Sequence, residues 1–274
     1  MYDSLVSTPS SISLKPLIGI LGTSAGNPRN VPPLKAIFDR PDVLVVEINP
    51  NTFDPARSAS FFHCDAFVVP GRPTNVHPSF YGSTPLADIE QSFDVKSDRL
   101  SFAMIAESLT RRVPFLGICS GMQLMQVYFG GILHQCLEHV VGDIHSSRYR
   151  PGTHQLEIIP GGLFEKMFAS QQPFWTNSSH EQGILSADLL PEDLAAEAVC
   201  KKTGVIEAAS HRTHPYMLGV QYHPESNTRG TANPHYAAVF SSFIEQAHTY
   251  AASRHRAACG LGAKPIRIPL AQPV

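Results

Sequence analysis

Four short apolar runs in the first half of the chain restrict the fold more than any other feature. They are rich in valine and isoleucine, and they cover Leu17–Leu21, Val43–Ile48, Ala66–Val69 and Phe115–Ile118. A strand that is apolar on both faces is typical of the parallel sheets of α/β proteins, where helices cover each side. We therefore expect these runs to be buried strands of a parallel sheet.

The segment between the third and fourth runs has the pattern of an amphipathic helix. Ser97 is the residue that we expect to cap its N-terminus, and the apolar residues that follow recur near helical spacing: Leu100, Ala103, Met104 and Leu109. A strand, a helix and a second strand in this order predict a βαβ unit.

The second half of the chain has a different texture. From about Leu156 it consists of short strand-like segments, HQLEII, PFWTNS, AAEAV and GVIEAAS, and residues 202–204 form a plausible hairpin turn between the last two. Asn233 and Pro234 then predict the start of a final helix. Its apolar stripe should pack on the sheet, and it comprises Tyr236, Val239, Phe240, Phe243, Ile244 and Ala247.

These patterns predict an α/β fold with a mostly parallel central sheet flanked by helices and a mixed or antiparallel extension in the C-terminal half. We expect one domain over residues 16–257. Residues 1–15 are rich in serine and threonine and residues 258–274 in glycine and proline, so we interpret them as a flexible N-terminal segment and a C-terminal tail.

Composition favours a small-molecule partner. The chain has 274 residues, with Lys+Arg 21 against Asp+Glu 23, and no long run of either charge that would attract nucleic acid or a membrane surface. No apolar stretch reaches the roughly 18 residues that span a bilayer. The five cysteines lack CxxC spacing, which favours a reducing, cytoplasmic environment over a disulfide framework.

The segment around Cys119 predicts a nucleophile. The apolar run Phe115–Ile118 leads into Gly117-x-Cys119-x-Gly121, the cysteine version of a nucleophile elbow, in which small flanking residues are needed for a tight turn between strand and helix. The start of the helix favours a thiolate, and the Ser120 N–H would point toward an oxyanion. The alternative is a buried, inert cysteine.

A second segment predicts the base. Met217–Val220 reads as a strand, and His223 and Glu225 follow it on either side of Pro224, which favours an extended chain in which residues two apart share a face. A carboxylate beside an imidazole fixes its tautomer, so Cys119, His223 and Glu225 are the predicted catalytic triad. The alternative is an ordinary hydrogen-bonded histidine at a strand end.

Other candidate sites lack support. His134 with His139, or His211 with His214, have no third ligand that the sequence identifies, so we predict no metal and no cofactor. The remaining cysteines have no glycine elbow, and we interpret them as structural or incidental: Cys64, Cys136, Cys200 and Cys259.

GICSGMQ followed by GVQYHPE resembles the class I glutamine amidotransferase superfamily over roughly residues 15–250. Within it, residues 69–78 and 177–183 most resemble the γ-glutamyl-γ-aminobutyrate hydrolase branch, which cleaves glutamylated amines in polyamine breakdown. The resemblance implies a second oxyanion N–H near Gly71, opposite Ser120. It also implies a substrate pocket made by Gln123 and by the backbone of Glu181 and Gln182 near His180.

The expected function is hydrolysis of γ-glutamyl amides of small amines through a γ-glutamyl thioester. One alternative is a glutaminase component that delivers ammonia to a synthetase; ammonia-delivering relatives usually carry consecutive glycines where this chain has Pro70, Gly71 and Arg72. Another is a binding protein that keeps the fold without turnover. The sequence leaves a homodimer open.

Overall fold

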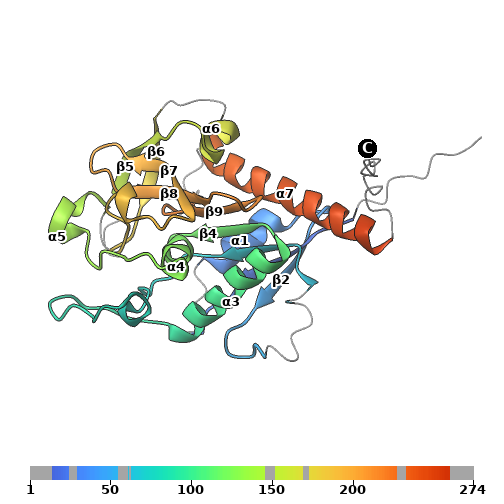
Figure 1. The fold of residues 1–274 in the computed structure, drawn as a ribbon, viewed down its shortest axis with the longest axis horizontal. Helices are drawn as coiled ribbons and strands as arrows, with labels where there is room; N and C mark the ends of the chain where they lie inside the picture. Colours follow the sequence, from blue (N-terminus) through green and yellow to red (C-terminus); the bar gives the residue numbers. More distant parts are fainter. Residues whose placement is uncertain are drawn as a thin grey trace, which may run out of the picture.

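The computed structural model describes residues 14–24, 30–54, 61, 63–145, 152–168, 173–226 and 233–259. A single sheet of nine strands runs through this part of the chain in the order β2-β1-β3-β4-β9-β8-β7-β5-β6 (Figure 1). Most of the predicted N-terminal segment and C-terminal tail lies outside the described residues, so the predicted domain limits stay a prediction.

One part of the sheet is parallel. Its strands pair in parallel from β2 through β1, β3 and β4 to β9. Their bounds are β1 (Leu17–Leu21), β2 (Leu44–Ile48), β3 (Ala66–Val69), β4 (Phe115–Ile118) and β9 (Met217–Val220). The prediction of strands buried on both faces is confirmed for β3 and β4, which are buried at every position. It is wrong for β2, because β2 is the edge strand and Leu44 on it is 51% exposed.

The other part is antiparallel, as the second half of the sequence predicts. It comprises β5 (Gly152–Ile158), β6 (Phe174–Ser178), β7 (Leu194–Cys200) and β8 (Ile206–His211). The hairpin turn at residues 202–204 is confirmed: Cys200 N–H donates to the Val205 carbonyl at 2.8 Å, and Gly204 has φ 76°. Because β8 pairs antiparallel with β9, the two parts form one continuous sheet.

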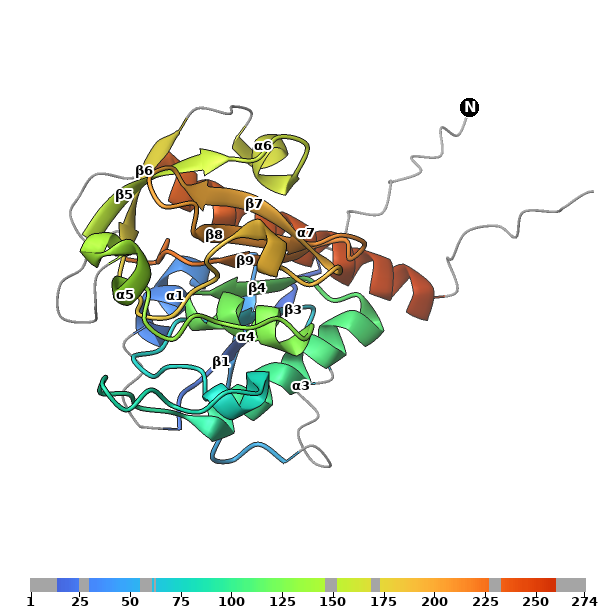
Figure 2. The ribbon, with the colours of Figure 1, turned by 60° about the vertical axis from the view of Figure 1, so that its left-hand side comes forward.

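Helices cover both faces of the parallel part. The bounds of the longer helices are α1 (Val31–Phe38), α3 (Val95–Arg111), α4 (Ser120–Tyr128) and α7 (Pro234–Ala258). Buried side chains of α1 and α7 share one apolar cluster and those of α3 and α4 the other, and Figure 2 shows the two pairs on opposite sides of the sheet. The shorter helices are α5 (Glu138–Val141), α6 (Leu163–Phe168), η1 (Pro78–Tyr81), η2 (Asp143–His145) and η3 (Ala187–Leu189).

The predicted crossover helix begins earlier than its sequence suggested. Its cap is Asp94, whose side chain accepts from the Ser97 N–H at 3.1 Å, so Ser97 is already in the first turn. Aspartate caps a helix as well as serine does, and three residues separate an N-cap from the N–H that it satisfies. The expectation that Ser97 is the cap is therefore wrong, although the helix itself is confirmed.

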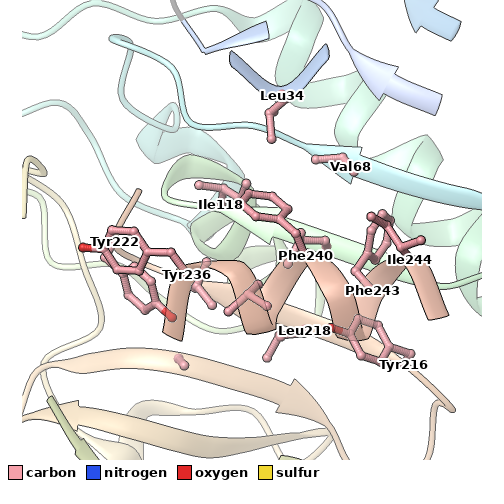
Figure 3. Packing of buried hydrophobic residues seen from close by; sticks show 14 of the residues in the cluster. Leu34, Val68, Ile118, Tyr216, Leu218, Tyr222, Tyr236, Phe240, Phe243 and Ile244 are labelled. Atoms are coloured by element: carbon pink, nitrogen blue, oxygen red, sulfur yellow. The ribbon is translucent and has the colours of Figure 1, made fainter. Parts of the chain in front are cut away.

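The apolar stripe of α7 is buried as predicted. Asn233 caps the helix by accepting from the His235 N–H at 3.0 Å. Figure 3 shows Phe240 and Phe243 of α7 among Leu34, Ile118 and Leu218, with Tyr222 beside Tyr236. Burying side chains of this size contributes about 1.5–3 kcal/mol each, so α7 is held firmly against the middle of the sheet, where β4 pairs with β9.

In the described part of the chain, no helix is both long enough and apolar enough to cross a membrane.

Candidate active site

Cys119 lies at the turn between β4 and α4, as the elbow pattern predicts. It has φ 51° and ψ −105°, a conformation that non-glycine residues rarely adopt, and it occupies the N-cap position of α4. Its N–H donates to the Val220 carbonyl of β9 at 2.7 Å, and its carbonyl accepts from the Gln123 N–H at 3.1 Å. Backbone strain that the fold holds in place in this way is a mark of functional sites.

The glycines around Cys119 are required by close backbone contacts. A methyl group added at Gly121 would lie 2.2 Å from the carbonyl oxygen of Val69, and one at Gly117 would lie 2.6 Å from the carbonyl carbon of Gly121. At Gly71 it would lie 2.5 Å from Cε1 of His223 and 2.9 Å from Cβ of Cys119. The Gly71 backbone therefore lies directly against both Cys119 and His223.

His223 is oriented by Glu225 and by Asn177. Nδ1 of His223 lies 2.8 Å from Oε1 of Glu225. The Asn177 side chain accepts from the His223 N–H at 2.9 Å and donates to the His223 carbonyl at 2.8 Å. The Asn177 N–H in turn donates to the hydroxyl of Tyr236 on α7 at 2.9 Å, so α7 helps to position the imidazole.

The predicted pairing of His223 with Glu225 is confirmed, but its backbone explanation is wrong. The two residues do not continue β9 as an extended chain. Ser226 N–H donates to the His223 carbonyl at 3.2 Å, which closes a turn over Pro224 and Glu225. The turn, and not the two-residue period of a strand, brings the carboxylate to Nδ1.

The charges around His223 favour its protonated form. Burial lowers the pKa of His223, but the neighbouring Cys119 thiolate and the Glu225 carboxylate raise it, and the net result is a pKa well above its usual value. An imidazolium beside a thiolate is the ion pair that activates cysteine nucleophiles.

A pocket of about 400 Å³ opens over Cys119 and His223. The structure brings most of the predicted site residues to its wall, namely Cys119, Ser120, Gln123, His180, Glu181, Gln182 and His223. Arg72 also reaches the wall, but its side chain is 1% exposed and forms an ion pair with Asp98 at 2.5 Å. Its guanidinium is therefore directed into the protein and braces the loop that carries Gly71.

The family model of Peptidase C26 matches residues 42–225 of this sequence. The chain belongs to the Peptidase C26 family. The γ-glutamyl-γ-aminobutyrate hydrolase of Escherichia coli (strain K12) is 34% identical over 200 residues, which cover 70% of this chain and 75% of that relative. The resemblance stated from the two motifs is thereby confirmed.

Solved structures show the same fold at low identity. The glutaminase domain of a Trypanosoma brucei CTPS with bound acivicin has a TM-score of 0.60 at 17% identity and covers 86% of this chain and 94% of its own. A glutamine amidotransferase from Thermotoga maritima has a TM-score of 0.55 at 15% identity and covers 89% and 92%. The predicted fold class is confirmed as a mixed sheet flanked by helices.

In this Peptidase C26 member, the amides of Gln123 and Gln182 brace the pocket wall. Nε2 of Gln123 donates to the Gln182 carbonyl at 2.8 Å and lies 3.2 Å from Oε1 of Gln221. The Gln182 side chain accepts from the Val76 N–H at 2.9 Å and donates to the Val76 carbonyl at 3.2 Å. These bonds tie residues 177–182, which comprise the end of β6 and the loop after it and which we call the substrate loop, to α4 and to the segment after β3.

Sequence reasoning gave no role to Gln221, although the structure places it at the nucleophile. It is fully buried, and its Nε2 lies 3.5 Å from Sγ of Cys119. A donor at this distance stabilises a thiolate more than a thiol. The signal was present in the sequence, because Gln221 is the first polar residue after β9, and the carboxyl ends of parallel strands are where ligands bind in open α/β sheets.

Sequence reasoning also missed a group of histidines behind the substrate loop. Nδ1 of His145 and Nε2 of His154 each lie 3.2 Å from Oε1 of Glu207, and Nε2 of His180 lies 3.6 Å from the same oxygen. We call these four residues the buried histidine cluster. They come from η2, β5, the substrate loop and β8, so their spacing in the sequence does not predict that they lie together.

Three members of the cluster have the spacing of metal ligands. The ligand atoms of His145, His180 and Glu207 all lie within 4.8 Å of one another. The imidazole nitrogens that face Glu207 lie 3.2–3.6 Å from its Oε1 without the alignment of a hydrogen bond. The group is a buried carboxylate in close contact with three imidazoles.

Proposed function

We propose that this chain hydrolyses γ-glutamyl amides of small amines, with Cys119 as the nucleophile, His223 as the acid and base, and Glu225 as its orienter. The observation that carries the proposal is the Glu225–His223 contact of 2.8 Å beside a cysteine held at φ 51° on the pocket wall. The relatives at 34% identity support the γ-glutamyl class of substrate.

The first half of the reaction forms a thioester. The Cys119 thiolate attacks the γ-carbonyl carbon, and the oxyanion accepts hydrogen bonds from the Ser120 N–H and from an N–H near Gly71. The C–N bond then breaks, and the His223 imidazolium gives its proton to the departing amine. Cys119 now carries a γ-glutamyl group, and His223 is neutral.

The second half returns the enzyme to its starting state. Neutral His223 takes a proton from a water molecule, and the resulting hydroxide attacks the thioester carbonyl. The C–S bond breaks, glutamate leaves, and the thiolate and imidazolium are restored. Every proton in this cycle moves through His223, and no cofactor takes part.

Pocket size and position favour a glutamyl acyl group with a small leaving amine. A volume of about 400 Å³ is that of a small-ligand site. The braced Gln123 and the substrate loop hold the acyl part, and positioning the γ-carbonyl over Cys119 removes much of the entropic barrier to attack. Free ammonia is too small a leaving group to add binding in the transition state. The setting that we propose is breakdown of glutamylated amines in a reducing cytoplasm.

The experiment compares kcat/KM for γ-glutamyl-γ-aminobutyrate, glutamine and an α-glutamyl dipeptide, with glutamate release as the readout. We expect the first substrate to be preferred and the α-linked peptide to be inert, because its reacting carbonyl lies away from Cys119. A preference for glutamine would assign the chain to the glutaminases that supply a synthetase. Cleavage of the α-linked peptide alone would refute the γ-glutamyl proposal.

A further inference from the structure

The buried histidine cluster is almost closed to solvent, and of its four residues only His180 reaches the pocket wall. The side chains of His145, His154, His180 and Glu207 are each at most 1% exposed. Such a carboxylate is costly to bury unless cations or hydrogen-bond donors surround it. The Glu207 carboxylate therefore needs a cation or donors beside it, and an imidazolium in the cluster supplies both.

His145 is the ring that carries this charge. Burial lowers the pKa of His145, but Cys200 and Glu207 raise it, and it comes to about 9. Burial raises the pKa of Glu207, but the three histidines lower it by more, and the net pKa lies well below its usual value. The Glu207 carboxyl is therefore ionised. Among the residues that the structure describes, the other titratable groups that face the cluster are Cys200 of β7 and Tyr222 after β9.

His180 connects the cluster to the substrate loop. Because the Gln182 carbonyl can only accept, Nδ1 of His180 keeps its proton and donates to that oxygen at 2.9 Å. The same carbonyl accepts from Nε2 of Gln123 at 2.8 Å. The orientation of the His180 ring thus fixes the carbonyl that also holds Gln123.

A second connection runs through the backbone to Cys119. The Glu207 carbonyl accepts from the Gln221 N–H at 2.8 Å, and the Gln221 side chain contacts Sγ of Cys119 at 3.5 Å. Glu207 therefore supports the site from its side chain through His180 and from its main chain through Gln221.

We propose that the buried histidine cluster is a positioning device for the substrate loop, and that it holds the loop in place while an imidazolium balances the Glu207 carboxylate. If the charge on His145 is lost, the carboxylate faces the unprotonated Nε2 of His180 without compensation, and the ring and its carbonyl partner move. The name of the acyl group that the loop binds rests on the proposed function, whereas the position of the loop does not.

The decisive variant is Glu207→Gln, which keeps the shape and removes the charge. We expect KM for γ-glutamyl-γ-aminobutyrate to rise roughly tenfold or more, because small displacements of a positioning group are costly. Alkylation of Cys119 by iodoacetamide should stay near the wild-type rate, since His223 and Glu225 are untouched. Hydrogen exchange of amides 177–182 should become faster while that of α7 stays unchanged. Glu207→Asp should recover part of the loss.

The matched control is His214→Gln. His214 is also a buried histidine, and its Nε2 lies 3.1 Å from the Ser108 carbonyl, away from the pocket. The His214→Gln substitution should leave KM and the hydrogen exchange of amides 177–182 unchanged. If Glu207→Gln does not fold, His145→Gln tests the same charge balance.

Three results would overturn the proposal. One is an unchanged KM together with unchanged exchange of amides 177–182 in a folded Glu207→Gln protein, which would leave the cluster with a purely structural role. Another is a rise in KM in His214→Gln that is as large as the rise in Glu207→Gln. The third is one equivalent of bound metal that Glu207→Gln loses. If the wild-type protein hydrolyses no γ-glutamyl amide, the proposed function fails, but the exchange experiment still decides the role of the cluster.

Discussion

Two histidine–carboxylate groups in this protein use the same chemistry for different ends. At the pocket, His223 pairs with one carboxylate, Glu225, and its side chain is 12% exposed. In the buried histidine cluster, three imidazoles share Glu207 and none is more than 1% exposed. A carboxylate that orients a histidine is thus not by itself evidence of catalysis.

The difference lies in the second ring nitrogen. Glu225 occupies Nδ1 of His223, which leaves Nε2 for Cys119 and a substrate. In the cluster, Nε2 of His145 lies 2.9 Å from the Thr203 hydroxyl, and Nδ1 of His180 donates to the Gln182 carbonyl. The cluster nitrogens that lack a hydrogen-bond partner are buried, away from Cys119, so these rings act by holding other groups.

The largest effect should come from substitutions at the pocket, in Cys119 and His223. Cys119→Ala and His223→Ala should lower kcat by on the order of 10⁴-fold or more, because each removes a group that makes or breaks a bond. Steady-state glutamate release measures this, with circular dichroism to verify folding. Cys64→Ala, a buried cysteine outside the pocket, is the control; near-wild-type turnover in folded Cys119→Ala protein would contradict the assignment.

The next effect separates orientation from bond making. Glu225→Gln should lower kcat by up to about 10⁴-fold and shift the pH profile. Since Glu225 is among the groups that raise the pKa of His223, its loss lowers that pKa, and the alkaline limb of kcat/KM should move to lower pH. An alkaline limb that stays in place would show that Glu225 does not set the charge of His223.

A smaller loss should follow from the close contact at Gly71. In Gly71→Ala the added methyl meets His223 and Cys119, so we expect kcat to fall on the order of a hundredfold, with about 1–3 kcal/mol of destabilisation. Gly22→Ala is the control, because its methyl meets only the end of the Glu47 side chain. Equal losses of kcat in the two variants would argue against a specific role for Gly71.

The smallest effect concerns stability and the buried histidine cluster. The folded pKa of His145, about 9, lies above its usual 6.5, so its contribution is complete below about pH 6.5 and is lost as the pH rises toward about 9. The pKa of Glu207 is lowered, so its contribution is lost as the pH falls below its usual value. Urea unfolding at about pH 6 and about pH 9 should differ by on the order of 1 kcal/mol more in wild type than in Glu207→Gln. If the change in unfolding free energy between the two pH values is equal in both proteins, the charge on His145 is not balanced by Glu207.

Local patterns predicted much of this molecule. Apolar runs located β1, β3 and β4, and the glycines around Cys119 predicted a turn that the backbone contacts require. The edge position of β2 could not be predicted, because it depends on strand order and not on the composition of the strand.

The site was predictable only where its residues are close together in the sequence. His223 and Glu225 are two residues apart, so their pairing could be expected. Glu207 and its three histidines come from separate elements, and the sheet brings them together. Asn177 lay in a motif that the resemblance used, but its two bonds to the His223 backbone follow only from the turn after β9.

The central claim is that Cys119 receives the glutamyl group, and acid-quenched mass spectrometry tests it most directly. The protein is mixed with γ-glutamyl-γ-aminobutyrate, quenched within one turnover and digested. The account predicts a peptide containing Cys119 that carries one glutamyl group, is labile to hydroxylamine and is absent in Cys119→Ala. Glutamate release with no adduct on any cysteine, or an adduct on another residue, would contradict it.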